Sequence, residues 1–559
     1  MGSKKSSKNS IRLIPLGGVE EFGMNMMCYE CGDERVIVDC GAMFPEADML
    51  GVDLVIPDIT WLLEEPEKVK AIVLTHGHDD HIGALPYILP ELNVPVYGTP
   101  LTLAYVAHKL SEHGILEDVD LVEIPWREWT ELSDAFEVMP VHVTHSMPDS
   151  AAIALRCAAG VVIQTGDYKI DYAPLTGQTF DFATFSRLGE EGILALVGDS
   201  TNADVSGSTQ SEVWVARHLE PIFASSLRAI YCSTFSSSVH RIQLLMDLAC
   251  AFGRKIFIAG RSLERTIAIA SEQGFLKPPR KEMMSLKEIE KVPPHKRMII
   301  ATGSQAEALS AMSRISVGEH KQLHVEEDDT VIISSRVIPG HLRPITRMIN
   351  RFYKLGARVY DSISHKVHAS GHAYAEEIKA MISLTQPRYL VPVHGELRQI
   401  MHHRRVAMDM GFHEDAIHIL EDGDVLELSN IRARYRDKIE TGHVLVDGKT
   451  IGETGEVVLR DRQHLSEDGM IIAILNVDQK TGQLVTDPEI VTRGFVYVDE
   501  SEEIIEDLKG IVGDAFRALT PESREDHDFM HAELRRSLRK HIKKTYQRFP
   551  MILPVVQEI

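Results

Sequence analysis

The chain has 559 residues and a formal net charge of −23; 44% of its residues are hydrophobic and 25% are charged. This composition is typical of globular proteins with large cores, and the negative charge argues against broad, non-specific binding of nucleic acid. Because no run of about 18 apolar residues occurs, we expect no membrane span, and the six cysteines, too few for a disulfide scaffold, favour the cytoplasm.

Residues 1–10 are polar and basic, which predicts a flexible tail rather than a secretory signal. Between residues 11 and 205, short apolar strands alternate with helical stretches, as in α/β domains. We expect these strands at residues 11–15, 36–39, 71–75, 94–97, 136–144, 151–157, 161–164 and 193–197.

Residues of metal-binding type follow several of these strands. The motif His76-Gly77-His78-Asp79-Asp80-His81 comes after the apolar run 71–74, and His145 and Asp167 follow two later strands. Imidazole nitrogens and carboxylate oxygens are ligands that zinc and manganese accept, and strand ends are rigid supports for them. The sequence therefore predicts a metal site at the strand ends of this domain.

The pattern changes between residues 206 and 361. Helical stretches separate short apolar strands, and this βαβ spacing predicts a parallel sheet. The strands are expected at residues 229–232, 255–258, 298–301, 331–333 and 358–360. Small polar residues follow the first four strands, and ligands of parallel sheets bind beyond the carboxyl ends of the strands. We expect an inserted α/β domain with an edge that suits phosphate.

The first pattern resumes over residues 362–428, where His394 again ends a strand. The polar, charged segment 429–442 is predicted to be a linker. Residues 443–559 are predicted to form a small α+β domain with strands at 444–446, 470–475 and 495–498. Two helices follow, and the last of them runs from about 523 to 549. Its apolar stripe favours a packing face over an RNA-binding arm; the stripe consists of Leu534, Leu538, Ile542 and Tyr546.

Several motifs together resemble those of the bacterial ribonuclease J family, in the β-CASP branch of the metallo-β-lactamase superfamily. They are His76 to His81, Thr165-Gly166-Asp167, Gly198-Asp199-Ser200-Thr201, His368-Ala369-Ser370-Gly371-His372, Pro392-Val393-His394-Gly395-Glu396, Leu459-Arg460-Asp461-Arg462 and Thr492-Arg493-Gly494-Phe495-Val496-Tyr497. Arg336 and His341 depart from the family pattern, in a segment where substrate contacts are expected.

The resemblance implies an α/β fold with three parts. An αββα metallo-β-lactamase sandwich would comprise residues 11–205 and 362–428, and a parallel-sheet β-CASP domain would be inserted at residues 206–361. After the linker, residues 443–559 would form a small α+β assembly domain that brings chains together as a homodimer or homotetramer.

The resemblance also implies two zinc ions, with manganese or magnesium as alternatives that support activity. By position in the motifs, one ion would be held by His76, His78 and His145. The other would be held by Asp80, His81 and His394, with Asp167 between both. Asp39 matches the first motif of the superfamily, which supports ligands rather than binding metal.

Two divalent cations lower the pKa of a water molecule between them and neutralise a phosphodiester oxygen. Asp80 is expected to act as ligand and proton acceptor. His372 lies outside the ligand set, so it is free to donate a hydrogen bond or proton to the scissile phosphate or the leaving oxygen, with Asp199 orienting it.

A further group of residues is predicted to bind the substrate and its terminal phosphate. It comprises Ser237, Ser238, His240, His368, Ala369, Ser370, Gly371 and His372. For His240 and His368, a purely structural role is an equally weighted alternative.

The function implied by the resemblance is that of a 5′-to-3′ exoribonuclease preferring 5′-monophosphate ends, with endonuclease activity, in rRNA processing and mRNA decay. An RNA-degradation complex or the ribosome would be its partner. Three alternatives are weighed against it. A small-molecule hydrolase would not need the inserted domain or His372. A DNA nuclease of the same branch is disfavoured by His394, and a weakly active scaffold subunit for a paralogue is disfavoured because every ligand position is intact.

Overall fold

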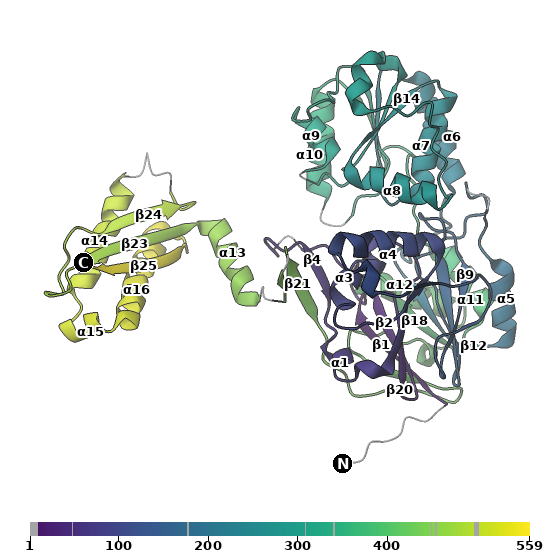
Figure 1. Cartoon of the computed structure of the whole chain (residues 1–559), viewed down its shortest axis with the longest axis horizontal. Helices are drawn as coiled ribbons and strands as arrows, with labels where there is room; N and C mark the ends of the chain where they lie inside the picture. The colour runs from purple at the N-terminus through teal and green to yellow at the C-terminus, as the bar shows by residue number, and fades with distance from the viewer. Residues whose placement is uncertain are drawn as a thin grey trace. The chain divides into compact units, whose positions relative to one another are not determined.

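The computed structural model describes residues 9–46, 48–175, 178–307, 309–338, 341–448, 450–452, 455–496 and 502–559. The chain divides into two compact units, which are shown in Figure 1. The first unit contains Met1–Phe44 and Val55–Val444, and the second contains Pro45–Leu54 and Leu445–Ile559. Among the described helices, none combines the length and the apolar character that crossing a membrane requires.

Two facing β-sheets form the centre of the first unit. The first sheet has the order β20 (Ala433–Tyr435), β19 (Leu426–Leu428), β1 (Ile11–Gly17), β2 (Met26–Cys31), β3 (Glu34–Val38), β5 (Val69–Val73), β6 (Val96–Gly98) and β7 (Leu121–Glu123). The second has the order β18 (Tyr389–Val393), β12 (Ile193–Asp199), β11 (Gly160–Gln164), β10 (Ala151–Cys157), β9 (Glu137–His142) and β8 (Thr130–Glu131).

Apolar side chains from both sheets meet in one core, where Tyr29, Val38, Ile153 and Val197 are buried. Burial between two layers explains why these strands are apolar along most of their length. Helices cover the outer faces. Those on the second sheet are α5 (Phe182–Glu191), α11 (Ala375–Thr385) and α12 (Leu397–Asp409). Beside the first sheet lie α1 (Thr60–Leu63), α2 (Asp79–Ile82), α3 (Leu85–Ile88) and α4 (Pro100–His113). The predicted αββα sandwich is confirmed.

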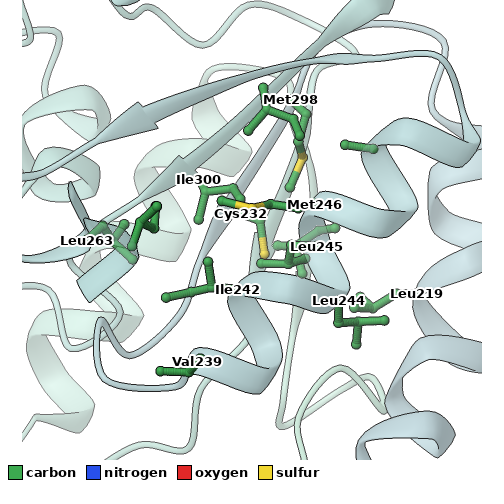
Figure 2. Packing of buried hydrophobic residues seen from close by; sticks show 14 of the residues in the cluster. Leu219, Cys232, Val239, Ile242, Leu244, Leu245, Met246, Leu263, Met298 and Ile300 are labelled. Atoms are coloured by element: carbon green, nitrogen blue, oxygen red, sulfur yellow. The ribbon is translucent and has the colours of Figure 1, made fainter. Parts of the chain in front are cut away.

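A second layered domain is inserted after β12 (Figure 1). Its five strands are all parallel, in the order β14 (Lys255–Ala259), β15 (Arg297–Ala301), β13 (Ile230–Ser233), β16 (Thr330–Ile333) and β17 (Arg358–Asp361). One face carries α6 (Glu212–Ser225), α7 (Val239–Ala251) and α8 (Arg261–Glu272); the other carries α9 (Ala311–Ser316) and α10 (Leu342–Lys354). Figure 2 shows Ile242, Leu245 and Met246 of α7 packed with Cys232 and Ile300 of the sheet.

The second unit contains a three-stranded sheet of β24 (Glu489–Arg493), β23 (Met470–Val477) and β25 (Met551–Glu558). Helices α14 (Glu502–Arg517) and α16 (His527–Tyr546) cover one face of it, and α13 (Glu456–Asp468) contacts β25. Leu534, Leu538 and Ile542 of α16 are fully buried, which confirms that the predicted stripe is a packing face. The remaining short elements are α15 (Pro521–Glu525), β4 (Leu54–Pro57), β21 (His443–Asp447) and β22 (Thr450–Ile451).

The structure differs from the predicted elements at several places, and strands β2, β7, β8 and β25 were not predicted. The segment 429–442 contains strand β20, where Arg434 lies opposite Glu427 of β19. Because β20 is an exposed edge strand, its composition is polar and looks like that of a linker.

In the second unit, residues 495–496 form a bend rather than the strand predicted at 495–498, and residues 497–498 lie outside the described residues. The strand is β24 instead, and Gly494 follows it with φ of +70°. The last predicted helix is two helices, since Asp526 interrupts it and its carboxylate accepts a hydrogen bond from the Phe529 amide at the start of α16.

Candidate metal centre and active site

The polar residues of the candidate site lie where five strands of the sandwich end. The loop after β5 supplies His76 and His78, and the short helix α2 that follows supplies Asp80 and His81. The loop after β9 supplies His145, and the loop after β11 supplies Asp167. Asp199 is the last residue of β12, and His394 follows β18 directly. Residues from distant parts of the sequence therefore meet at one edge of the fold.

The first group of ligand atoms is formed by three histidines and one carboxylate. His78 Nδ1 lies 2.9 Å from His76 Nε2 and 3.2 Å from His145 Nε2. Asp167 Oδ2 lies 3.6 Å from His76 Nε2 and 3.8 Å from His145 Nε2. Ligands about 2.1 Å from a tetrahedral ion are themselves about 3.4 Å apart, so this spacing suits a divalent cation.

The second group is formed on the other oxygen of the same carboxylate. Asp167 Oδ1 lies 3.3 Å from His81 Nε2 and 3.6 Å from His394 Nε2. Asp80 Oδ2 lies 3.6 Å from His81 Nε2 and 3.4 Å from His394 Nε2. In each group all four atoms lie within 4.8 Å of one another, and Asp167 belongs to both.

The charges and hydrogen bonds of the site fit bound cations. In the described part of the chain, no lysine or arginine forms an ion pair with the carboxylates of the site, which are Asp39, Asp80, Asp167 and Asp199. Asp167 is buried, yet its Oδ1 has no hydrogen-bond partner among the described residues. Buried polar atoms rarely lack partners. Four carboxylates that pair with histidines, and with no lysine or arginine among the described residues, carry as much negative charge as two divalent cations carry positive charge.

In the second group, the neighbouring carboxylates, Asp167 foremost, outweigh burial; they raise the pKa of His81 and raise that of His394 to about 10. In the first group, burial favours the form of histidine that binds metal. It lowers the pKa of His76 and His145 well below the ordinary value, and it lowers the pKa of His78. These three rings are therefore neutral at physiological pH, and a neutral imidazole nitrogen is a metal ligand.

Hydrogen bonds on the outer side hold the histidine rings in place. His81 Nδ1 donates to Asp39 at 2.8 Å, and His145 Nδ1 donates to the carbonyl of Gly371 at 2.7 Å. His394 Nδ1 lies 2.7 Å from the Thr201 hydroxyl. Contacts of this kind orient the rings of metal-binding histidines. Asp39 therefore supports His81 and stays outside both ligand groups.

The backbone is also adapted to the site at two residues. His394 has φ of +57° and Asp39 has φ of +64°, both in the left-handed region that side chains other than Gly, Asn, Asp and His seldom adopt. Gly371 approaches His145 so closely that a Cβ added to it would lie 2.7 Å from the ring. The strained backbone and the close glycine are of the kind found at functional sites.

His372 lies beside both groups, with its ring centroid 5.1 Å from that of His145 and 5.6 Å from that of His394. Its Nδ1 lies 3.0 Å from Asp199 Oδ2 and 3.8 Å from Asp167 Oδ2. Burial alone would lower the pKa of His372, but the carboxylates of Asp199 and Asp167 raise it above the ordinary value. The ring is 22% exposed, so Nε2 can meet a substrate. Because His372, Asp199, Asp167 and His394 also converge within 4.8 Å, metal binding by His372 is an alternative to test.

The residues predicted to bind substrate lie in different places. Ser370 Oγ accepts hydrogen bonds from Asn202 Nδ2 at 2.8 Å and from the His372 amide at 3.2 Å, so it shapes the His372 loop. Ala369 is buried in the core of the inserted domain. Ser238 precedes α7 and is buried, and Ser237 is half-buried beside it; no hydrogen bond among the described residues joins either side chain to the ligand groups.

His240 is buried and His368 is half-buried, and desolvation lowers the pKa of His240 to about 4 and of His368 to about 3. His240 lines a cavity of about 20 Å³ together with His145 and Gln178. A cavity of this size holds one water molecule and not a nucleotide. The cavity beside His240 thus has no room for a nucleotide, while His368 Nδ1 is buried without a hydrogen-bond partner among the described residues, so the role of each histidine stays a prediction.

Three further contributors had no predicted role. Thr201 donates to Asp199 at 2.6 Å and contacts His394; it stands in a quoted motif, which could have pointed to it. Asn25 Nδ2 donates to the Asp80 carbonyl at 3.0 Å. Arg336, noted only as a departure from the family pattern, hydrogen-bonds Asn202, and no local sequence signal predicts that pairing.

Comparison with protein families gives matches to most of the chain. Residues 25–175 match the metallo-beta-lactamase superfamily, and residues 356–418 match the Zn-dependent metallo-hydrolase RNA specificity domain. Residues 227–352 match the family described as ribonuclease J, beta-CASP domain, and residues 457–559 match the ribonuclease J C-terminal domain.

Curated relatives match over the full length. The chain is 38% identical to ribonuclease J2 of Bacillus subtilis, with 100% of both chains covered. It is 37% identical to ribonuclease J 1 of Streptococcus pyogenes, with 98% of both covered, and 37% identical to ribonuclease J of Synechocystis, with 99% of this chain and 88% of the relative covered. A protein of unknown function from Enterococcus faecalis shares the fold, with a TM-score of 0.52 and 13% identity over 78% of this chain and 100% of that one.

Proposed function

This chain belongs to the ribonuclease J family, and from that premise we propose that it is a two-cation ribonuclease that degrades RNA from its 5′ end. The observation that carries the proposal is the convergence of two ligand groups on the two oxygens of Asp167. Each oxygen faces histidine nitrogens and has no lysine or arginine partner among the described residues, as a carboxylate shared by two cations would.

His76, His78 and His145 would hold one cation, and Asp80, His81 and His394 the other, with Asp167 in both groups. We propose zinc, with manganese or magnesium able to support activity. Bound divalent cations would lower the pKa of water and neutralise a phosphodiester oxygen.

Asp80 is placed to accept a proton from the attacking water. Its side chain is 35% exposed, whereas that of Asp167 is 2% exposed, so Asp80 is the carboxylate of the second group that solvent reaches. Its Oδ2 stays 3.4 Å from His394 Nε2, which keeps the ionised form stable.

His372 is placed to act as the general acid. Its Nδ1 donates to Asp199, which leaves Nε2 as the atom that can give a proton to the leaving 3′ oxygen. Asp199 is itself held by Thr201, whose amide and hydroxyl both donate to Oδ1. A chain of fixed contacts thus orients the imidazole.

Preference for a 5′-monophosphate completes the proposal. Ser370 accepts two hydrogen bonds, and its own hydroxyl proton remains available for a phosphate oxygen near His372. Each cut would expose a new 5′-monophosphate, so one end-binding event would support repeated removal of mononucleotides. Internal cleavage would occur where an RNA enters the site without its end being captured.

The test compares one RNA with a monophosphate, a triphosphate or a hydroxyl at its 5′ end, labelled internally and incubated with Mn²⁺ or Mg²⁺. We expect mononucleotides to appear first from the 5′ end and fastest from the monophosphate form. Equal rates for the three ends, or release from the 3′ end first, would contradict the proposed direction. If no RNA is cleaved with either metal, the proposal that this chain is a nuclease is contradicted.

We also propose that the second unit joins chains into dimers or tetramers. The face of its sheet away from α14 and α16 presents Leu553 and Val555, which are 38% and 37% exposed. Light scattering should give a lower mass for the Leu553→Glu/Val555→Glu protein than for the unchanged chain. Val485→Glu/Phe529→Glu, at two exposed apolar residues elsewhere in the unit, is the matched control. Equal masses would refute the assembly role of this face.

We place this activity in the cytoplasm, because all six cysteines are free thiols in the structure.

A further inference from the structure

We propose that the outer face of α10 is an RNA-binding surface that holds the sugar-phosphate backbone of the substrate outside the cleavage site. We call this surface the α10 stripe, and it consists of Arg343, Arg347, Arg351 and Lys354. The inference rests on the proposed function, because it takes RNA to be the substrate.

The sequence of α10 places all four basic residues on one side of the helix. Positions three and four apart lie on the same helical face. The opposite face carries Ile345, Met348, Ile349 and Phe352, which are buried against the parallel sheet. The four basic residues therefore project away from the sheet, over about 16 Å of helix at 1.5 Å per residue.

The charge of the stripe is not neutralised. The helix contains no acidic residue, and in the described part of the chain none of the four basic side chains forms an ion pair or a side-chain hydrogen bond. Two other exposed arginines of the same domain are paired, Arg358 with Asp328 and Arg265 with Glu112. In a chain of net charge −23, a local group of four unpaired positive charges is selective for a polyanion.

The stripe is connected to the His372 loop through the segment before α10. Arg336 hydrogen-bonds Asn202, and Asn202 Nδ2 donates to Ser370 Oγ at 2.8 Å. Gln305 fixes the same segment, since its Nε2 donates to the Arg336 carbonyl at 2.8 Å and its Oε1 accepts from the Ile338 amide at 2.9 Å. The start of the stripe is thus anchored to the loop that carries the proposed general acid.

The spacing of the charges favours a nucleic-acid backbone as the occupant. Arg343, Arg347 and Arg351 follow one another every four residues, which is about 6 Å along the helix. A regular row of point charges suits a row of phosphates, and such contacts position RNA without reading its sequence. Tyr353, 54% exposed on the flank of this face, offers a ring on which a base can stack. An acidic protein surface is the competing occupant.

The test uses the Arg343→Gln/Arg347→Gln/Arg351→Gln protein and 5′-monophosphorylated RNAs of 20 and 3 nucleotides. The matched control is Arg405→Gln/Arg432→Gln/Arg434→Gln, three exposed arginines of the sandwich without ion pairs among the described residues. We expect KM for the long RNA to rise about tenfold in the stripe variant, with kcat unchanged and the short RNA unaffected. The slope of log KM against log salt should fall by about 2, from three lost phosphate contacts in a single strand.

The outcomes separate this inference from the proposed function. If the unchanged chain cleaves RNA but KM for the long RNA is the same in the stripe variant, the α10 stripe does not bind RNA. An acidic protein surface is then the favoured partner. A rise in KM for both RNA lengths, or an equal rise in the control, would also overturn it. If the unchanged chain cleaves nothing, the proposed function fails, and fluorescence anisotropy with the same 20-nucleotide RNA decides the stripe: weaker binding only in the stripe variant supports it.

Discussion

Two buried charged residues near strand ends, Asp167 and Arg241, differ in how their charges are balanced. At the edge of the sandwich the charge is Asp167, which faces histidine nitrogens and has an oxygen without a hydrogen-bond partner among the described residues. In the inserted domain the charge is Arg241, which is 1% exposed and fully engaged by protein groups.

Arg241 has a complete set of partners. Its Nε and Nη2 each donate to Glu212 at 2.8 Å, and its Nη1 donates to the carbonyl of Val367 at 3.0 Å and to Ser334. Glu212 and Val367 belong to the two segments that connect the inserted domain to the sandwich. The ion pair is therefore closed within the protein and holds these segments together.

The difference shows how a buried charge can be interpreted. A buried ion whose charge and hydrogen bonds are satisfied by the protein contributes to structure. A buried carboxylate that is surrounded by histidine nitrogens and has no lysine or arginine partner among the described residues is suited to a cation from solution. Asp167 follows β11, and Arg241 of α7 contacts Ser334 just after β16, so a place near a strand end does not by itself separate a binding site from a structural contact.

The largest effect should follow removal of the shared carboxylate. Asp167→Asn should empty both ligand groups and reduce RNA cleavage below detection, whereas Asp80→Asn should lose about half of the bound metal, because Asp80 belongs to one group. Elemental analysis of the purified proteins measures the metal, and circular dichroism verifies the fold. Equal metal content in the two variants would contradict the assignment of Asp167 to both ligand groups.

The next effect concerns His372, which is beside the ligand groups but held by Asp199. His372→Ala should keep both metals and lose on the order of 10²-fold in rate, as for a positioned general acid. His372→Gln, which retains a polar side chain without the proton, should be as slow. If metal is lost together with activity, His372 is a ligand and the third converging group is the relevant one.

The smallest effect on activity should come from Arg241, because its contacts are structural. Arg241→Met leaves the Glu212 carboxylate buried without its partner and should lower the free energy of unfolding by about 3–5 kcal/mol. Glu212→Leu/Arg241→Met removes both charges and should recover much of that loss. Thermal unfolding measures both, and cleavage at 25 °C should change little in the double variant. A loss of metal from Arg241→Met would show that the Arg241–Glu212 ion pair and the metal site are coupled.

Sequence reasoning reached the ligand residues because they are short motifs at strand ends. His76 to His81 follow an apolar run, and His394 and Asp167 each end one, so their types and places predict a metal site before any coordinates. The parallel inserted sheet follows from the spacing of apolar runs, whereas the two layers of the sandwich were implied by the family resemblance.

Contacts between distant segments could not be predicted in this way. Arg336 and Asn202 lie in different domains, and only the fold brings them together. Strand β20 is polar because it is an edge strand, so periodicity does not distinguish it from a linker. The burial of His240 depends on packing that its own neighbours in sequence do not reveal.

The four carboxylates of the metal centre have a consequence for the life of the protein in the cell. Without cations, their mutual repulsion is relieved only by protons on nearby histidines, so the folded chain is less stable than it is when loaded. A ligand that binds only the folded state stabilises it by RT ln(1 + [L]/Kd). We therefore expect the melting temperature to rise with free metal concentration, and proteases to remove the unloaded chain first. The abundance of this protein would then follow the metal supply of its cell.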